Sequence, residues 1–252
     1  MFKNYFKGIK AYGGTFSLIS KLGLWSYFLV PILISILTAV FIGLMAWGWA
    51  DNIGGLIAKL WIWEWGAETF RSISNFLGGI AVVAVGLILY KHIIMALSAP
   101  FMAPVSEKIE AHITGKEIQV QRSQFFPLLW RGIRVTLRNL FMELFFTVPI
   151  LLFGLIPVIG ILSTPLLFLV QAYYAGFGNM DYTLERHFDY SKSNAFVRSH
   201  SGIAMGNGTV FMLFLLIPVI GVILVLPLSV TAASTATLET IFPSKEKQIT
   251  NT

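Results

Sequence analysis

The chain has 252 residues, of which 56% are hydrophobic and only 12% are charged, and its mean hydropathy is +0.76. Soluble domains carry about 25% charged residues, so this composition excludes an ordinary soluble protein and indicates a multi-pass membrane protein in one membrane domain, residues 1–252. The lack of cysteine excludes disulfides and thiolate metal sites. The net charge of +6 comes from loops beside apolar segments, so it favours anionic lipid or an anionic solute over nucleic acid.

Residues 1–21 predict an amphipathic helix on the membrane surface. Aromatic residues and an isoleucine recur at near-helical spacing, while Lys3, Lys7 and Lys10 fall on another face. Aromatic side chains opposite lysines suit the headgroup layer of a bilayer. The pair at positions 13–14, both glycine, is expected to interrupt this helix.

Two long transmembrane helices are predicted next. Residues 22–50 lack a charge, contain Pro31 near their start, and end with Trp47 and Trp49 placed as an aromatic belt. A short loop at residues 51–71 leads to the second transmembrane helix at residues 72–97.

Residues 98–139 form the largest polar segment, in which Pro104 is expected to open a helix. Arg131, Arg134 and Arg138 are three and four positions apart and therefore share one helix face. One interpretation places these arginines on lipid phosphates. The other makes them a ladder that attracts an anion, since guanidinium groups match tetrahedral oxyanions.

A hexapeptide, Leu-Ile-Pro-Val-Ile-Gly, occurs twice, at residues 155–160 and 216–221. Each copy lies in the middle of a long uncharged segment. Proline ends a helix and glycine permits a sharp turn, so each segment predicts a helical hairpin, one at residues 140–180 and one at 201–241. The predicted hairpin tips are Pro157, Gly160, Pro218 and Gly221.

Each hairpin arm has roughly 16 uncharged residues, or about 25 Å, whereas a membrane crossing needs about 20 residues. We therefore predict that both hairpins are re-entrant, although four thin, tilted crossings remain an alternative. Backbone at a buried helix tip needs partners inside protein or a watery cavity, and so we expect a homo-oligomer. The predicted fold is thus an all-α integral membrane protein with two long transmembrane helices, two re-entrant hairpins and amphipathic interfacial helices.

No enzyme motif is visible, and neither a metal site nor a cofactor site is predicted. The sequence has no His-x-x-x-His pair, no Gly-x-Ser-x-Gly turn and no phosphate-binding loop.

The order of several short motifs resembles the CysZ family of bacterial sulfate permeases over nearly the whole chain. The matching residues are the apolar segment 22–33, Ala99-Pro100-Phe101, residues 105–110, Asp181-Tyr182, Phe196, Arg198, Gly206-Asn207-Gly208, Ile217-Pro218, Pro227 and Ala232-Ala233. This resemblance implies an oligomeric protein of the bacterial inner membrane that takes up sulfate for cysteine synthesis.

The resemblance also implies a sulfate site at the start of the first membrane helix, where the family has Gly-Leu-Arg. Here the tripeptide is Gly23-Leu24-Trp25, and the nearest cation is Lys21. Lys21, Gly23 and Leu24 are therefore the candidate binding residues, with the three arginines as steering charges. The alternative function is a non-transporting scaffold or membrane-remodelling protein that binds anionic lipid.

Overall fold

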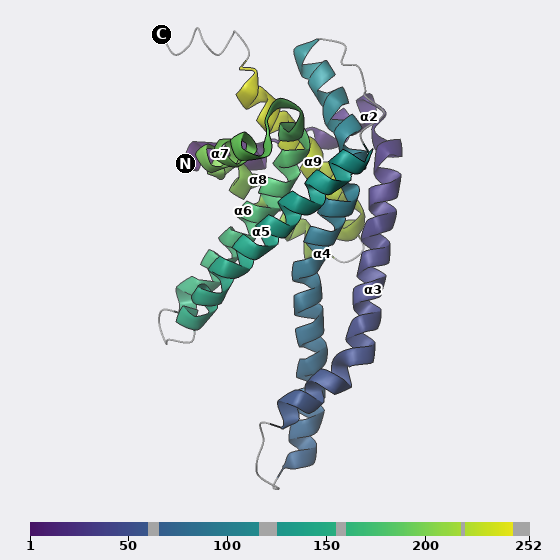
Figure 1. The fold of residues 1–252 in the computed structure, drawn as a ribbon, viewed down its shortest axis with the longest axis vertical. Coiled ribbons are helices and arrows are strands. Elements are labelled where there is room, and N and C mark those ends of the chain that lie inside the picture. Colours follow the sequence, from purple (N-terminus) through teal and green to yellow (C-terminus); the bar gives the residue numbers. More distant parts are fainter. Residues whose placement is uncertain (60–65, 116–124, 155–159, 218–219, 244–252) are drawn as a thin grey trace. The chain divides into compact units, whose positions relative to one another are not determined.

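The computed structural model describes residues 1–59, 66–115, 125–154, 160–217 and 220–243. Within these ranges the chain is helical and contains no strand, as the sequence predicts (Figure 1). The helices are α1 (Phe2–Lys10), α2 (Thr15–Lys21), α3 (Trp25–Ala58), α4 (Ala67–Thr114), α5 (Phe125–Gly154), α6 (Gly160–His187), α7 (Tyr190–Ser199), α8 (Ser201–Leu215) and α9 (Ile220–Ile241).

Among the described residues, 5 helical segments are long and apolar enough to cross a membrane. They are Trp25–Ala58, Ile88–Thr114, Phe125–Gly154, Ile161–His187 and Ile223–Ile241. α8 is also apolar but shorter. Length and composition thus confirm a multi-pass, all-α membrane protein.

The chain forms two compact units, one of residues 33–94 and one of residues 1–32 together with 95–252. In the first unit, the segments from α3 and α4 pack side by side (Figure 1). Gly78 lies against the backbone of Ala50, and Gly86 lies against the side chain of Ile42. Small residues of this kind let membrane helices approach closely.

Both long helices extend beyond the predicted segments. α3 continues to Ala58, and α4 runs from Ala67 to Thr114, with Pro100 and Pro104 inside it. Pro104 therefore does not open a new helix, which corrects the prediction from the sequence. A proline inside a membrane helix is tolerated where neighbouring helices and local backbone adjustments satisfy the freed carbonyl groups.

The predicted interruption near the N-terminus is confirmed. α1 ends at Lys10 and α2 begins at Thr15, with Gly14 between them at φ +84°. Only glycine adopts this left-handed conformation without strain. The break lets α1 pack on α8 while α2 packs on α9.

The core of the larger unit lies around α6, which packs against α5, α7, α8 and α9. A cluster of buried side chains fills this region: Val135, Phe177, Met180, Leu184, Val197, Ile203, Ala204, Ala233 and Ala236. Burial of apolar surface at this centre fixes α5, α6 and α7, which carry most of the charged side chains discussed below.

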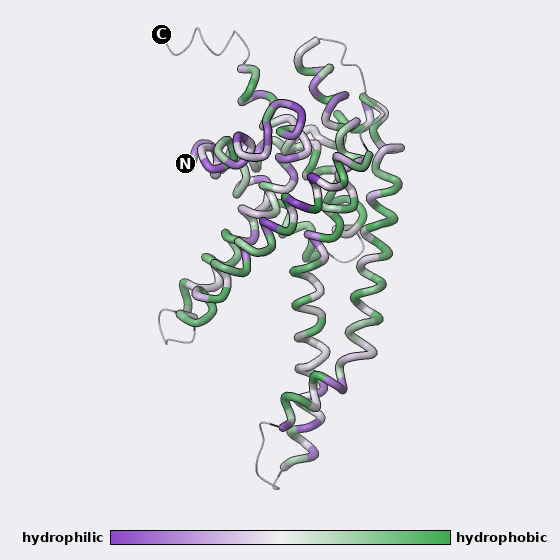
Figure 2. The backbone as a smooth tube through the Cα atoms, in the orientation of Figure 1, coloured by the Kyte–Doolittle hydropathy of each residue, from purple (hydrophilic) through white to green (hydrophobic). Residues whose placement is uncertain are grey.

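In the sequence, the first copy of the hexapeptide follows the end of α5 and the second copy follows the end of α8. Gly160 begins α6, and Gly221 lies in the first turn of α9, close to the carbonyl oxygen of Phe214. Pro157 and Pro218 lie outside the described residues. α5 and α6 have 30 and 28 residues, because each helix continues into its polar flank. Figure 2 shows that α5 becomes mainly hydrophobic toward its C-terminal end and that α6 is mainly hydrophobic near its start. The re-entrant insertion of both hairpins stays a prediction.

Asp189 caps the N-terminus of α7. Its Oδ1 accepts the backbone N–H of Lys192 at 2.8 Å. This hydrogen bond stabilises the carboxylate and so lowers the pKa of Asp189 below its ordinary value of 3.8. The cap therefore contributes its full stability above pH 3.8, and the contribution is lost as the pH falls through the lowered pKa of the folded state.

We expect Asp189→Asn to weaken this acid dependence while keeping an N-cap, because the asparagine oxygen accepts the same bond at every pH. Thermal unfolding of detergent-solubilised wild type and variant between pH 7 and pH 3 tests this. Parallel pH profiles for the two proteins would contradict the assignment.

Candidate anion-binding site

The side chain of Arg131 on α5 is held by groups from α6 and α7. Its Nε and Nη2 donate to the two carboxylate oxygens of Asp181 at 3.2 and 2.9 Å. Nη1 donates to the carbonyl oxygen of Phe188 at 3.1 Å, and Nη2 also donates to Ser193 Oγ at 2.9 Å. Arg131 therefore joins three helices, and its charge is neutralised by a bidentate carboxylate.

A second ion pair involves the last turn of α6, five positions after Asp181. Arg186 Nη2 donates to Glu110 Oε2 of α4 at 2.7 Å, and His187 Nε2 lies 3.0 Å from the same oxygen. The side chains of Arg186 and Glu110 are only 17% and 11% exposed. Like Arg131, Arg186 is committed to a contact between helices.

Arg134 and Arg138 have different surroundings, although they share a face of α5 with Arg131. The guanidinium carbon of Arg134 lies 4.5 Å from the centre of the Tyr190 ring, and that of Arg138 lies 5.2 Å from the centre of the Phe177 ring. Arg138 Nη1 also donates to Asn139 Oδ1 at 3.2 Å. In the described part of the chain, neither arginine forms a salt bridge with a carboxylate.

The arginine–aromatic cluster comprises Arg134 and Arg138 of α5 with the rings of Tyr190 and Phe177 that they contact. A further arginine, Arg198, lies near the C-terminal end of α7, a helix that packs against α6. The sequence assigned no anion-binding role to Arg198, yet Tyr190 and Arg198 are eight positions apart, a spacing that returns to a similar helix face.

The cluster is suited to an oxyanion. An aromatic ring covers one face of each stacked guanidinium, which leaves the N–H groups at its edge able to donate. Arg134 is exposed and Arg138 is half-buried. These two arginines are one helical turn apart on α5, so they can present two positive groups to a tetrahedral anion.

The other predicted site is formed at the junction of α2 and α3. Lys21 is exposed at the end of α2, whereas the side chain of Leu24 is fully buried. Gly23 has φ +62°, and its N–H donates to the carbonyl oxygen of Ser20 at 3.2 Å. The N–H of Leu24 donates to the carbonyl oxygen of Ile19 at 2.9 Å. Both backbone donors therefore cap α2, in the pattern typical of a glycine-terminated helix.

Trp25 occupies the position at which the family that this sequence resembles has arginine, and its side chain makes contacts within the protein. Its indole N–H donates to Ser20 Oγ at 3.1 Å, and its ring packs edge-on against Phe16 with 5.2 Å between centres. Lys21 consequently supplies the only positive side chain of the predicted Lys21, Gly23 and Leu24 patch. Within the described ranges, Lys21 forms no salt bridge.

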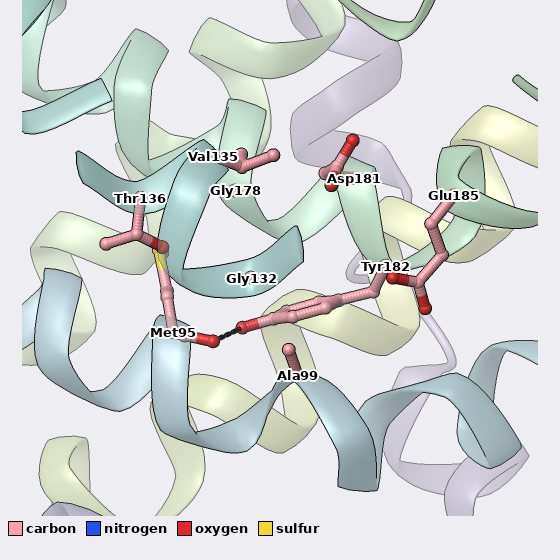
Figure 3. Close-up of a pocket in the computed structure, with 9 residues that line it drawn as sticks. All are labelled: Met95, Ala99, Gly132, Val135, Thr136, Gly178, Asp181, Tyr182 and Glu185. Carbon is pink, nitrogen blue, oxygen red and sulfur yellow. Dashed lines mark hydrogen bonds between the residues drawn. The ribbon is translucent and has the colours of Figure 1, made fainter. Parts of the chain in front are cut away.

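A small cavity lies between α4, α5 and α6 (Figure 3). It has a volume of about 10 Å³, and its polar side is formed by Asp181, Tyr182 and Glu185. Tyr182 Oη donates to the carbonyl oxygen of Met95 at 2.6 Å across this space. Such a volume accommodates one water molecule and is too small for a tetrahedral oxyanion. This cavity is therefore excluded as a site for an anion of that size.

Comparison with known proteins identifies the family. A family model described as Sulfate transporter CysZ/Etoposide-induced protein 2.4 matches residues 11–226. Two relatives, each called Sulfate transporter CysZ, come from Pseudomonas aeruginosa strains LESB58 and PAO1. Each is 25% identical over 232 residues, covering 88% of this chain and 90% of the relative. Both are named as transporters and not as enzymes, in agreement with the sequence. The chain belongs to the Sulfate transporter CysZ/Etoposide-induced protein 2.4 family.

Proposed function

We propose that this protein carries sulfate or a related oxyanion across the bacterial inner membrane as a permease or channel, and that the imported sulfate supports cysteine biosynthesis. The main support is the match to proteins named as sulfate transporters over 88% of the chain. The arginine–aromatic cluster adds a chemical reason, because its guanidinium groups can bind a tetrahedral dianion.

In this proposal the cluster concentrates the anion before it enters the membrane. Arg134 and Arg138 lie at the polar end of α5, and the helix becomes apolar beyond Glu143. Cations beside an entrance raise the local concentration of an anion and its rate of association, an effect that salt weakens. Arg131 positions α5 against α6 and α7, and Lys21 supplies a further attracting charge at the end of α2.

We further propose that both hairpins are re-entrant and that several copies of the chain assemble around the pathway. The uncharged parts of the hairpin arms are short, Gly160 begins α6, and Gly221 lies in the first turn of α9. Backbone groups at membrane-embedded tips need polar surroundings, which neighbouring protomers and a shared aqueous path would provide. Cross-linking of the protein in native membranes tests the assembly, and a purely monomeric pattern would contradict it.

The transport proposal is tested by uptake of radiolabelled sulfate into proteoliposomes. Wild type is expected to exceed empty vesicles clearly. The double variant R134Q/R138Q is expected to lower the initial rate at low sulfate and low salt by about tenfold, and the difference should shrink as ionic strength rises. A matched control, K59Q/R71Q, removes the same charge from exposed positions in the other unit and should retain wild-type uptake.

Two outcomes would overturn these assignments separately. Uptake by wild type equal to that of empty vesicles would contradict transport and would favour the scaffold function. Robust wild-type uptake that is unchanged in R134Q/R138Q would keep the transport function and exclude the cluster as its entrance. In that case, the Lys21→Gln variant would become the next test of the α2–α3 junction.

A further inference from the structure

The N-terminal helix α1 is fixed along one side by close contact with α8. Gly8 of α1 lies against the backbone of Ile203, and Gly206 of α8 lies against the backbone of Tyr5. Tyr5 Oη lies 3.1 Å from Thr209 Oγ1. After α1 ends, Tyr12 Oη donates to Ser229 Oγ of α9 at 2.7 Å and so attaches the following turn. This side of α1 is therefore a protein contact.

The other side of α1 faces an open groove of about 550 Å³ between α1 and α9. Lys3, Lys7 and Lys10 all line it, because positions i, i+4 and i+7 share a helix face. Thr235 and Glu239 of α9 form the opposite wall.

Lys7 is tied to the α9 wall of this groove. Its Nζ donates to Thr240 Oγ1 at 2.7 Å and lies 3.7 Å from Glu239 Oε2. Lys3 and Lys10 are exposed on either side of it. Three lysines with one carboxylate leave the groove strongly basic, so its complement is an anion.

Exposed aromatic surface lies beside these lysines. The side chain of Phe6 lines the groove and is 55% exposed, and Phe2, one turn earlier, is 84% exposed. A small soluble anion would leave both rings in water. An amphiphile with an anionic head would cover the rings with its apolar chains while its head contacts the lysines.

We propose that this groove is a binding site for an anionic phospholipid. The phosphate of the headgroup contacts Lys3 and Lys10, and the acyl chains lie along Phe2 and Phe6. This inference does not depend on the proposed solute, since it concerns groups on α1 and α9 that take no part in the arginine–aromatic cluster. It gives the anionic lipid a defined site between α1 and α9, whereas the sequence predicted only that residues 1–21 lie on the membrane surface and that the basic charge favours anionic partners.

The site also has a consequence for the fold. Because α1 is packed on α8 and attached through Tyr12 to α9, a lipid in the groove joins the membrane surface to the second hairpin. The bound lipid is therefore expected to stabilise the folded protein, as any ligand does that binds the native state alone.

Native mass spectrometry of the full chain in detergent can measure this binding, with phosphatidylglycerol as the probe and phosphatidylcholine as the zwitterionic reference. Each lysine near an anionic lipid strengthens binding about fivefold, so K3Q/K10Q should weaken phosphatidylglycerol binding by about 25-fold. K3R/K10R keeps both charges and should restore it. K59Q/R71Q removes two exposed charges outside the groove and should leave it unchanged. All three variants alter exposed side chains, and a monodisperse elution profile verifies folding.

Support requires preferential binding of phosphatidylglycerol, its loss in K3Q/K10Q and its recovery in K3R/K10R. Equal binding of the two lipids by wild type would overturn the proposal, as would wild-type affinity in K3Q/K10Q. A competition experiment with glycerol phosphate completes the test, because this compound carries the anion of the headgroup but has no acyl chains. If it displaced phosphatidylglycerol at comparable concentrations, the groove would bind a soluble anion and the lipid assignment would be wrong.

Discussion

Replacing Arg131 with methionine is expected to lower the free energy of unfolding by about 3–5 kcal/mol, the usual cost of removing one partner from a buried ion pair. Arg131 and Asp181 have side chains only 19% and 7% exposed, so the variant would leave the Asp181 carboxylate buried without its cation. The substitution also removes the donors to Phe188 and Ser193. Equilibrium unfolding in detergent, followed by tryptophan fluorescence, measures the effect.

The adjacent arginine provides the control. Arg134 is exposed and contacts the Tyr190 ring, so R134M is expected to cost no more than about 1 kcal/mol. Combining R131M with D181N removes the carboxylate that R131M leaves buried without a cation. The double variant should therefore lose less free energy of unfolding than the sum of the losses of the two single variants. Equal losses for R131M and R134M would show that Arg131 does not join α5 to α6 and α7.

The contrast between these arginines marks the limit of prediction from the sequence. Their spacing correctly placed Arg131, Arg134 and Arg138 on one helix, but it treated them as equivalent. What separates them is Asp181, a residue remote in the sequence that only the packing of α6 on α5 brings within 2.9 Å of Arg131. Whether the remaining arginines steer an anion stays a prediction.

Local patterns predicted the helical elements better than their ends. The amphipathic N-terminal helix, the break at Gly14 and the two helical pairs around the repeated hexapeptide follow from periodicity and from glycine or proline chemistry. The continuation of α4 through Pro100 and Pro104 did not follow, because tertiary packing overrides proline's tendency to end a helix.

The proposed Lys21, Gly23 and Leu24 patch illustrates a second limit. A glycine can be required at a position for its backbone conformation, while the backbone N–H groups at that position donate to the protein itself and not to a ligand. Gly23 keeps a positive φ, but the N–H groups of Gly23 and Leu24 donate to α2. The sequence gives the residue types but does not show which groups accept hydrogen bonds from these N–H donors. It therefore could not distinguish an anion-binding site from a helix cap.

The second large effect is expected at the crossing of α6 and α8. Gly176 of α6 lies against the carbonyl oxygen of Ala204, and Gly208 of α8 lies against the carbonyl oxygen of Ala172. Each helix thus contributes an alanine and a glycine four positions apart, and all four residues are buried. This is the small-xxx-small pattern that lets membrane helices approach at backbone distance.

Gly208→Ala is expected to destabilise the protein by about 3 kcal/mol, near the upper end of the usual cost of overpacking. The added Cβ would overlap the Ala172 carbonyl oxygen, which belongs to a helix backbone and cannot rotate away as a side chain would. Thermal unfolding in detergent measures the loss. Gly48→Ala is the matched control: it lies inside α3 with no atom within 4 Å of the added Cβ, so it should stabilise by about 0.5–1 kcal/mol. If the two alanine substitutions had the same effect, backbone contact at Gly208 could not be what holds α6 and α8 together.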